Sequence, residues 1–185
     1  NNVVAESVER GINYFDVAPT YGNAEERLGP ALEPYRENVF LACKTQKRDA
    51  KGAEKELNES LKILRTDYFD LYQLHAISNM EDVEQATAKG GALDTFVKAR
   101  ENGLVKYLGF SAHSAEAALA LMDRFDFDSI LFPFNYVTWH EGDFGPRVMK
   151  KAQEKNVARL ALKAMAKTRR ERGEPRGEYK KCWYK

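Results

Sequence analysis

Four residues of chemically useful type stand at the ends of three short apolar runs. Asp16 and Tyr21 follow the first run, Lys44 lies near the end of the second, and His75 near the end of the third. In parallel α/β folds, side chains just past the carboxyl ends of the strands line the active site. Three consecutive strands would therefore bring a carboxylate, a phenol, an ammonium group and an imidazole together.

Such a quartet suits one kind of proton transfer. A phenol is a poor proton donor at neutral pH unless its phenolate is stabilised, and a nearby lysine does this. An aspartate beside that lysine keeps it charged and aimed, while a histidine orients a substrate oxygen. The assembly predicts protonation of a carbonyl oxygen on which negative charge develops. A hydride donor would complete the reduction to an alcohol.

Each of the four residues also has an ordinary structural interpretation. Asp16 could cap the next helix, and Tyr21 beside Gly22 could be a turn residue. Lys44 could extend its ammonium group to solvent, and His75 could be a hydrogen-bonded structural residue. Their joint occurrence at matching strand ends favours the functional interpretation.

The elements that must position these residues alternate along the chain. Most of the apolar runs are continuous rather than alternating, which is typical of parallel strands covered on both faces. The predicted strands are 12–18, 38–45, 68–76, 105–113, 129–137 and 157–165.

Helical patterns separate these strands. Leu57, Leu61 and Leu64 form an apolar stripe suited to a sheet face. Gly103 is a predicted helix C-cap and Ser114 a predicted N-cap. A further helix is expected over 144–156. Strand–helix alternation of this kind indicates βα units.

Length and motif content then select a fold. A (β/α)₈ TIM barrel needs about 250 residues, whereas an open doubly wound sheet fits 185 residues without a missing piece. No G-x-G-x-x-G follows the first strand, where "APTYGN" stands instead, and this favours the barrel. We therefore expect one incomplete barrel domain over 1–185 with about six of the eight units. We expect 167–185 to be a loop or extended segment.

The two ends of the chain also indicate an incomplete barrel. Val4 and Val8 have helical spacing with no start signal before them, and "KKCWYK" closes the chain without a final element. We expect the chain to be incomplete at both ends. Unpaired sheet edges should then make the 185-residue chain inactive or poorly soluble by itself.

Composition excludes several partners. The formal net charge is +1, and no apolar run approaches the ~18 residues that cross a bilayer, so neither nucleic acid nor membrane is expected as partner. The N-terminus lacks a signal-peptide layout. Cys43 and Cys182 are far apart without metal spacing, which predicts reduced thiols and a cytoplasmic location. Strand alternation turns Cys43 away from Lys44, so an inert buried thiol is expected.

The motifs also carry a family resemblance. "YFDVAPTYGNAEERLGPAL" resembles the signature of the aldo-keto reductase family, and "VFLACKTQ" is similar to its lysine strand. "DYFDLYQLHA" and "GLVKYLGFSAHS" resemble its histidine strand and its fifth-strand segment. The matches run in the family's order over nearly the whole chain, which is identified as a divergent bacterial-type member.

This resemblance implies a barrel that binds a nicotinamide dinucleotide, usually NADPH, without a Rossmann domain. It also implies reduction of a small-molecule aldehyde or ketone. Asp16, Tyr21, Lys44 and His75 match the catalytic four, with Tyr21 as general acid and Asp16 also near the cofactor. Ser111 matches a serine that holds the nicotinamide carboxamide.

Three positions depart from the family pattern. Ala112 replaces a common asparagine, Leu131 replaces a glutamine that contacts the carboxamide, and Leu162, followed by Lys163, replaces a stacking tyrosine. By this resemblance Ala112, Leu131 and Lys163 are further candidate cofactor contacts. By this resemblance we expect the loop that reads the adenosine phosphate to lie outside the chain, so NADP and NAD both stay open.

Other interpretations stay open as well. Lys44 and Lys163 could form Schiff bases, as in barrel aldolases, or the barrel could be a non-catalytic regulatory subunit. His113 and His140 lack metal-like spacing, are read as loop residues, and no metal is expected, although His113 could lie near the cofactor. Trp139, in a predicted loop, could line a substrate pocket or serve a surface or core role, as could Phe144. The oligomeric state stays open.

Overall fold

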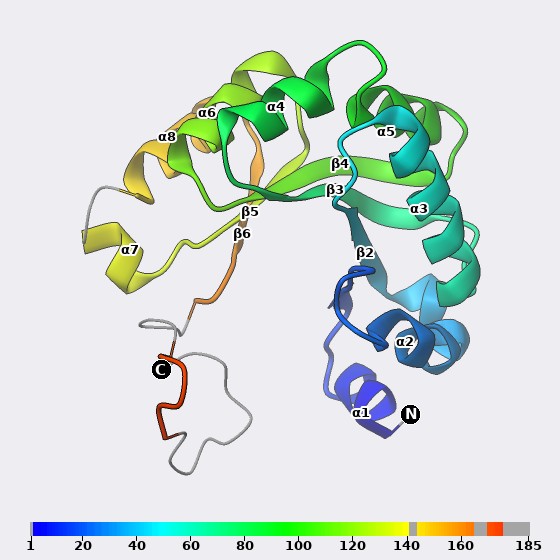
Figure 1. The fold of residues 1–185 in the computed structure, drawn as a ribbon. Helices are drawn as coiled ribbons and strands as arrows, with labels where there is room; N and C mark the ends of the chain where they lie inside the picture. Colours follow the sequence, from blue (N-terminus) through cyan, green and yellow to red (C-terminus); the bar gives the residue numbers. More distant parts are fainter. Residues whose placement is uncertain (1, 141–143, 165–169, 176–185) are drawn as a thin grey trace.

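The computed structural model describes residues 2–140, 144–164 and 170–175 of the chain. Its strands form one parallel sheet that curls into part of a barrel, and the helices cover the convex outer face (Figure 1). The strands are β1 (Tyr14–Asp16), β2 (Phe40–Thr45), β3 (Phe69–Ile77), β4 (Val105–Ala112), β5 (Ser129–Phe132) and β6 (Ala158–Ala161). The helices are α1 (Asn2–Glu9), α2 (Ala24–Leu32), the 3₁₀ helix η1 (Glu33–Asn38), α3 (Ala50–Leu64), α4 (Met80–Thr87), α5 (Ala92–Glu101), α6 (Ala115–Arg124), α7 (Tyr136–His140) and α8 (Pro146–Glu154).

The order of the strands distinguishes the two folds that the sequence allowed. Each strand pairs with its neighbours in sequence, in the order β1-β2-β3-β4-β5-β6, and every pair is parallel. A doubly wound sheet instead reverses its strand order at a switch point. The predicted six units of a (β/α)₈ barrel are therefore confirmed, and the open sheet is wrong.

The strand predicted over 12–18 is shorter in the structure, where β1 covers only Tyr14–Asp16, and the last two predicted strands also end early. The run 129–137 was predicted as one strand, but β5 ends at Phe132 and α7 begins at Tyr136. Pro133 follows β5 directly, and proline cannot donate a ladder hydrogen bond, so the strand stops there. β6 ends at Ala161, residues 162–164 form a turn, and residue 165 lies outside the described residues.

The main core lies between the outer face of the sheet and the helices. The stripe of α3 packs there as predicted, with Leu57 and Leu64 each 2% exposed. Ser114 caps α6 by accepting a hydrogen bond from the Ala117 N–H, so this predicted cap is confirmed. The C-cap of α5 is Asn102 rather than the predicted Gly103, which follows it with a φ of 75°. Burial of these stripes holds the helices on the sheet and the strand ends in place.

The inner face of the sheet is set by the parallel register. Lys44 lies opposite Gln73 on β3, and Ser111 on β4 lies opposite Leu131 on β5. Because side chains alternate along a strand, these residues share the concave face. An aromatic layer lies nearer the amino ends of the strands, where the Tyr14 and Phe40 rings stack with centroids 5.2 Å apart.

The amino ends of the strands carry a compact charge cluster. Asp70, 6% exposed, accepts hydrogen bonds from the Leu41 N–H and Lys106 Nζ and pairs with Arg36 at 3.0 Å. Burial raises the pKa of Asp70, but these hydrogen bonds and charges lower it more, so it stays below its usual range. The cluster stabilises the end of the barrel remote from the candidate site.

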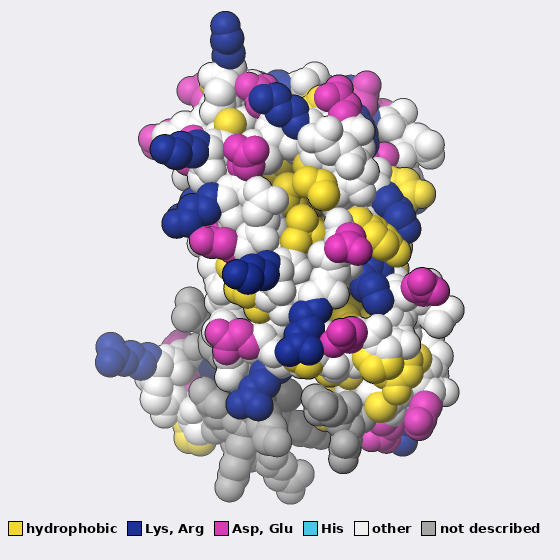
Figure 2. All heavy atoms as spheres, turned by 90° about the vertical axis from the view of Figure 1, so that its right-hand side faces the viewer, with side chains coloured by type: hydrophobic (Ala, Val, Ile, Leu, Met, Phe, Trp, Pro, Cys, Tyr) yellow, Lys and Arg dark blue, Asp and Glu magenta, His cyan; other side chains and the backbone are white. Residues whose placement is uncertain are grey.

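The outer surface carries mixed charges. On the face shown in Figure 2, Lys and Arg side chains alternate with Asp and Glu, and hydrophobic side chains lie between them. No helix in the described part of the chain is both long and apolar enough to cross a membrane. Of the expected segment 167–185, only 170–175 is described, and Cys182 lies outside the described residues.

Candidate active site

An ion pair between β1 and β2 forms the base of the candidate site. The Lys44 side chain is fully buried, and its Nζ donates to Asp16 Oδ1 and, at 3.3 Å, to the Val17 carbonyl. The other carboxylate oxygen of Asp16 accepts from Gln73 Nε2 at 3.3 Å. Lys44 therefore does not extend to solvent, and Asp16 does not cap α2, whose N-cap is Asn23.

Tyr21 and His75 lie over this ion pair. Lys44 Nζ is 5.0 Å from the centroid of the Tyr21 ring, and the Tyr21 and His75 rings meet edge to face with centroids 5.6 Å apart. The Tyr21 side chain is accessible, at 44% exposure. The structure thus brings together all four residues that the sequence singled out, at the carboxyl ends of β1, β2 and β3.

The surroundings of His75 keep its imidazole neutral. Burial, followed by the positive charges of Lys44, Arg48 and His113, lowers the pKa of His75 to about 4. Thr20 Oγ1 lies 3.5 Å from His75 Nδ1. When the Thr20 hydroxyl donates to Nδ1, Nε2 carries the ring proton and can donate it to a substrate oxygen.

A bulge in β3 presents His75. The register against β4 shifts between Leu74 and Ile77, and Ala76 has a φ of 56°, unusual for a residue with a Cβ. Ser111 Oγ accepts a hydrogen bond from the Ala76 N–H at 2.7 Å, which holds the bulge in place. Sequence reasoning did not predict this bulge, because no glycine marks it.

The candidate cofactor residues divide into two groups. Ser111, 2% exposed, lies beside the half-buried Leu131, and Lys163 follows β6 in a turn. The pKa of His113 is lowered mainly by burial and then by the positive charge of Lys163, so these two groups lie near each other. Ala112 instead packs in the hydrophobic core, because strand alternation turns it away from Ser111.

The residues on the concave face fit a nicotinamide ring. Ser111 Oγ accepts from Ala76, which leaves its hydroxyl proton to donate to a carboxamide oxygen. Leu131 and its register partner Leu160 add an apolar strip next to this hydroxyl. A polar anchor beside an apolar surface is the chemistry that a carboxamide-bearing aromatic ring requires.

The weaker candidates lie elsewhere. Trp139 and His140 are in α7 rather than in the predicted loop, and Phe144 stacks on Phe132 with centroids 4.8 Å apart. Cys43 is fully buried and contacts Glu25, and burial followed by the Glu25 charge raises the pKa of its thiol, as expected for an inert cysteine. In the described residues, no group of three or more His, Cys, Asp or Glu side chains could hold a metal ion.

Sequence reasoning missed several residues that contact the site. Gln73 binds Asp16, and its signal was a buried amide within an otherwise apolar run. Thr20 is only one residue before Tyr21 and had no distinguishing pattern. Arg48 donates to the His75 carbonyl from a loop after β2, and loop positions have no periodicity that predicts a long-range contact.

Comparison with known proteins identifies the family of the chain. The family model described as "Aldo/keto reductase family" matches residues 1–181. The chain belongs to the aldo/keto reductase family. Among the curated relatives of this aldo/keto reductase chain, the uncharacterized oxidoreductase YqkF of Bacillus subtilis (strain 168) is 28% identical over 148 residues, 72% of the chain and 46% of YqkF. Methylglyoxal reductase YeaE of Escherichia coli (strain K12) is 44% identical over 73 residues, 37% of the chain and 25% of YeaE.

Solved aldo/keto reductases share the fold. An aldo/keto reductase from Brucella melitensis aligns with a TM-score of 0.74 at 24% identity, over 89% of this chain and 62% of that one. The holo form of aldo-keto reductase AKR11C1 from Bacillus halodurans aligns with a TM-score of 0.71 at 24% identity, over 86% of this chain and 54% of that one. The chain spans 46% of YqkF, about half the length of that curated relative.

Proposed function

We propose that the four clustered residues reduce the carbonyl group of a small aldehyde or ketone to an alcohol, with NADPH or NADH as reductant. The single observation that carries the proposal is the convergence of Tyr21, His75 and the buried Lys44–Asp16 pair at one end of the sheet. Family membership and a relative named methylglyoxal reductase support it.

Tyr21 is the proposed proton donor. The residue is 44% exposed, so a substrate can approach its side chain, and its ring lies beside a buried positive charge. As the carbonyl oxygen gains negative charge, the Tyr21 O–H bond breaks and the proton moves to that oxygen. The Lys44 ammonium stabilises the phenolate left behind, and the proton is later restored from solvent.

Asp16 and His75 complete the proposed proton transfer. Asp16 compensates the charge of Lys44, whose side chain is fully buried and would be costly to leave without a counter-charge. His75, neutral at pH 7, donates its Nε2 proton to the substrate oxygen as a hydrogen bond and fixes its direction towards Tyr21. Asp16 is the lysine's partner rather than a separate acid.

When bound, a reduced nicotinamide would supply the hydride for the new C–H bond at the carbonyl carbon. Ser111 would hold its carboxamide, and Leu131 and Lys163 are further candidate contacts to the cofactor. We propose NADPH as the preferred cofactor, with NADH as the alternative. We also propose a cytoplasmic location, which the free thiol of the buried Cys43 supports.

The geometry does not favour a Schiff-base mechanism. An amine must be unprotonated to attack a carbonyl, whereas Lys44 is ion-paired with Asp16 and fully buried. Borohydride trapping with a carbonyl substrate tests this alternative directly, because a covalent adduct on Lys44 or Lys163 is incompatible with a hydride mechanism.

The test is a fluorescence titration of the purified protein with NADPH and NADH, followed by a panel of aldehydes. We expect saturable binding of at least one cofactor and its oxidation in the presence of an aldehyde. A K44M variant should bind the cofactor but lose most of the reduction rate. Equal rates for K44M and wild type would contradict the proposal.

A further inference from the structure

The main chain at the end of β3 is held by groups from several other segments. His75 occupies the first position of this segment, 75–78, and the register shift of β3 falls within it. The bonds are Arg48 Nη2 to the His75 carbonyl (2.9 Å), the Ala76 N–H to Ser111 Oγ (2.7 Å), the His113 N–H to the Ile77 carbonyl (2.9 Å) and the Ser78 N–H to Asp82 Oδ2 (2.9 Å). The position of the His75 ring thus depends on side chains outside β3.

Arg48 makes the contact to His75 itself. Its side chain is 13% exposed, and its Nε donates to Asp82 Oδ1 at 2.9 Å while Nη2 donates to the His75 carbonyl. The Arg48 main chain is also fixed, because its carbonyl accepts from the Ala92 N–H at 2.7 Å. The guanidinium group therefore bridges α4 and the end of β3 from an anchored loop.

Asp82 is suited to hold that guanidinium. Its carboxylate lies in the first turn of α4, where it accepts from the Ser78 N–H and from Arg48. Burial raises the pKa of Asp82, but the Arg48 and main-chain hydrogen bonds lower it more. Asp82 stays charged, and a planar, forked guanidinium can bind it and the His75 carbonyl at once.

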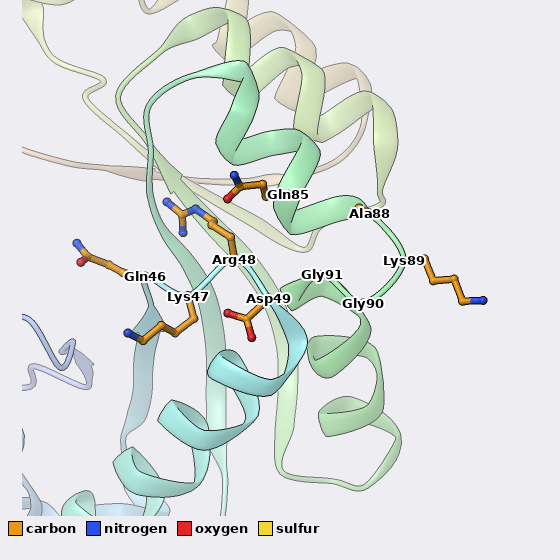
Figure 3. Close-up of a pocket in the computed structure, with 9 residues that line it drawn as sticks. All are labelled: Gln46, Lys47, Arg48, Asp49, Gln85, Ala88, Lys89, Gly90 and Gly91. Atoms are coloured by element: carbon orange, nitrogen blue, oxygen red, sulfur yellow. The ribbon is translucent and has the colours of Figure 1, made fainter.

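Arg48 lines a different part of the surface from the four clustered residues. Figure 3 shows Arg48 reaching from the loop after β2 towards Gln85 of α4, in the wall of a surface hollow of about 410 Å³. Residues 46–49, Gln85 and 88–91 line this hollow, and none of the four clustered residues does. Arg48 therefore contacts the main chain of His75 and not the place where a substrate would bind.

We propose that Arg48, anchored by Asp82, is a positioning residue that fixes His75 for substrate binding through the His75 carbonyl. This inference rests on the proposed reductase function. The charged and titratable groups that face His75 are Lys44 from β2, Arg48 from the next loop, His113 after β4 and Tyr21 after β1. The positive charge of Arg48 also opposes protonation of the imidazole and adds to the larger effects of burial and of Lys44 on the pKa of His75.

The test is an NMR titration of the histidine rings in the purified protein, without cofactor or substrate. The H75Q variant assigns the His75 signal. The R48M variant removes the charge and both hydrogen bonds. We expect the midpoint of the His75 pH titration to rise from about 4 by roughly half a pH unit or more. The chemical shifts of the His75 ring should also change. R48Q gives the same comparison if R48M does not fold.

Arg36 is the matched control. It is also part-buried and pairs with an aspartate, Asp70, at 3.0 Å, but it lies at the amino ends of the strands. R36M should lower the melting temperature and leave the His75 midpoint and ring shifts unchanged. An unchanged His75 in R48M, or an equal change in R36M, would overturn the proposal. Because no cofactor is present, this result is independent of whether the protein is a reductase.

Discussion

Replacing Asp16 with Asn should strongly destabilise the fold. Lys44 is fully buried, and Asp16 is its only acidic partner within the described residues; its other acceptor is the Val17 carbonyl. The D16N variant keeps the shape of the side chain but leaves a buried ammonium group without a counter-charge. We therefore expect a large loss in the free energy of unfolding.

The magnitude follows from burial. Breaking a buried ion pair by removing one partner costs about 3–5 kcal/mol. The Asp16 side chain is 24% exposed, so water partly screens the pair and the lower end, about 3 kcal/mol, is expected. The double variant D16N/K44M removes both charges and should recover to within about 1 kcal/mol of wild type. It should still lack reductase activity.

Urea unfolding of the wild type, D16N, K44M and the double variant measures this double-mutant cycle. The linear extrapolation gives the free energy of unfolding for each protein, and similar m values would show that the comparison is valid. A D16N loss below about 1 kcal/mol would refute the reasoning. So would a double variant no more stable than D16N.

Three further predictions concern pH, packing and capping. The pKa of His75 lies near 4, below the ordinary 6.5, so the unfolded chain binds more protons between these values and stability falls as pH falls from 6.5 to 4. The loss should be about 2 kcal/mol in urea unfolding and should be smaller in H75Q by that amount; parallel pH profiles would contradict it. G29A should cost about 1–3 kcal/mol, because a Cβ there would lie 2.8 Å from the Leu64 Cα and force α3 to move; an unchanged melting temperature would argue against this close packing. S114A should cost about 1 kcal/mol by removing the cap on the Ala117 N–H, and S114N, another good cap, should recover most of it.

The strands and the site could be predicted because their signals are local. Apolar runs of strand length locate each strand, and a polar residue at the end of such a run is visible in the sequence. Parallel strands place their carboxyl ends at one edge, so Asp16, Lys44 and His75 could be grouped from the sequence alone. The alternation of side chains along a strand correctly predicted that Cys43 points away from Lys44.

What could not be predicted depends on long-range contacts. The bulge after Leu74 carries no glycine, and its stability comes from Ser111 on the next strand. Arg48 reaches His75 across 27 positions of the chain, which no local pattern encodes. The end of the strand predicted over 129–137 was wrong because its apolar residues continue past Pro133 into α7, and hydrophobicity alone does not separate the two elements.

The central claim is that Tyr21 donates the proton, and a Y21F variant tests it most directly. Tyr21 is 44% exposed, so losing its hydroxyl should leave the melting temperature unchanged. NADPH oxidation with an aldehyde and fluorescence titration with NADPH are measured on the same preparation. We predict almost complete loss of carbonyl reduction with cofactor affinity largely retained. Reduction at the wild-type rate, or loss of cofactor binding in a folded variant, would contradict the account.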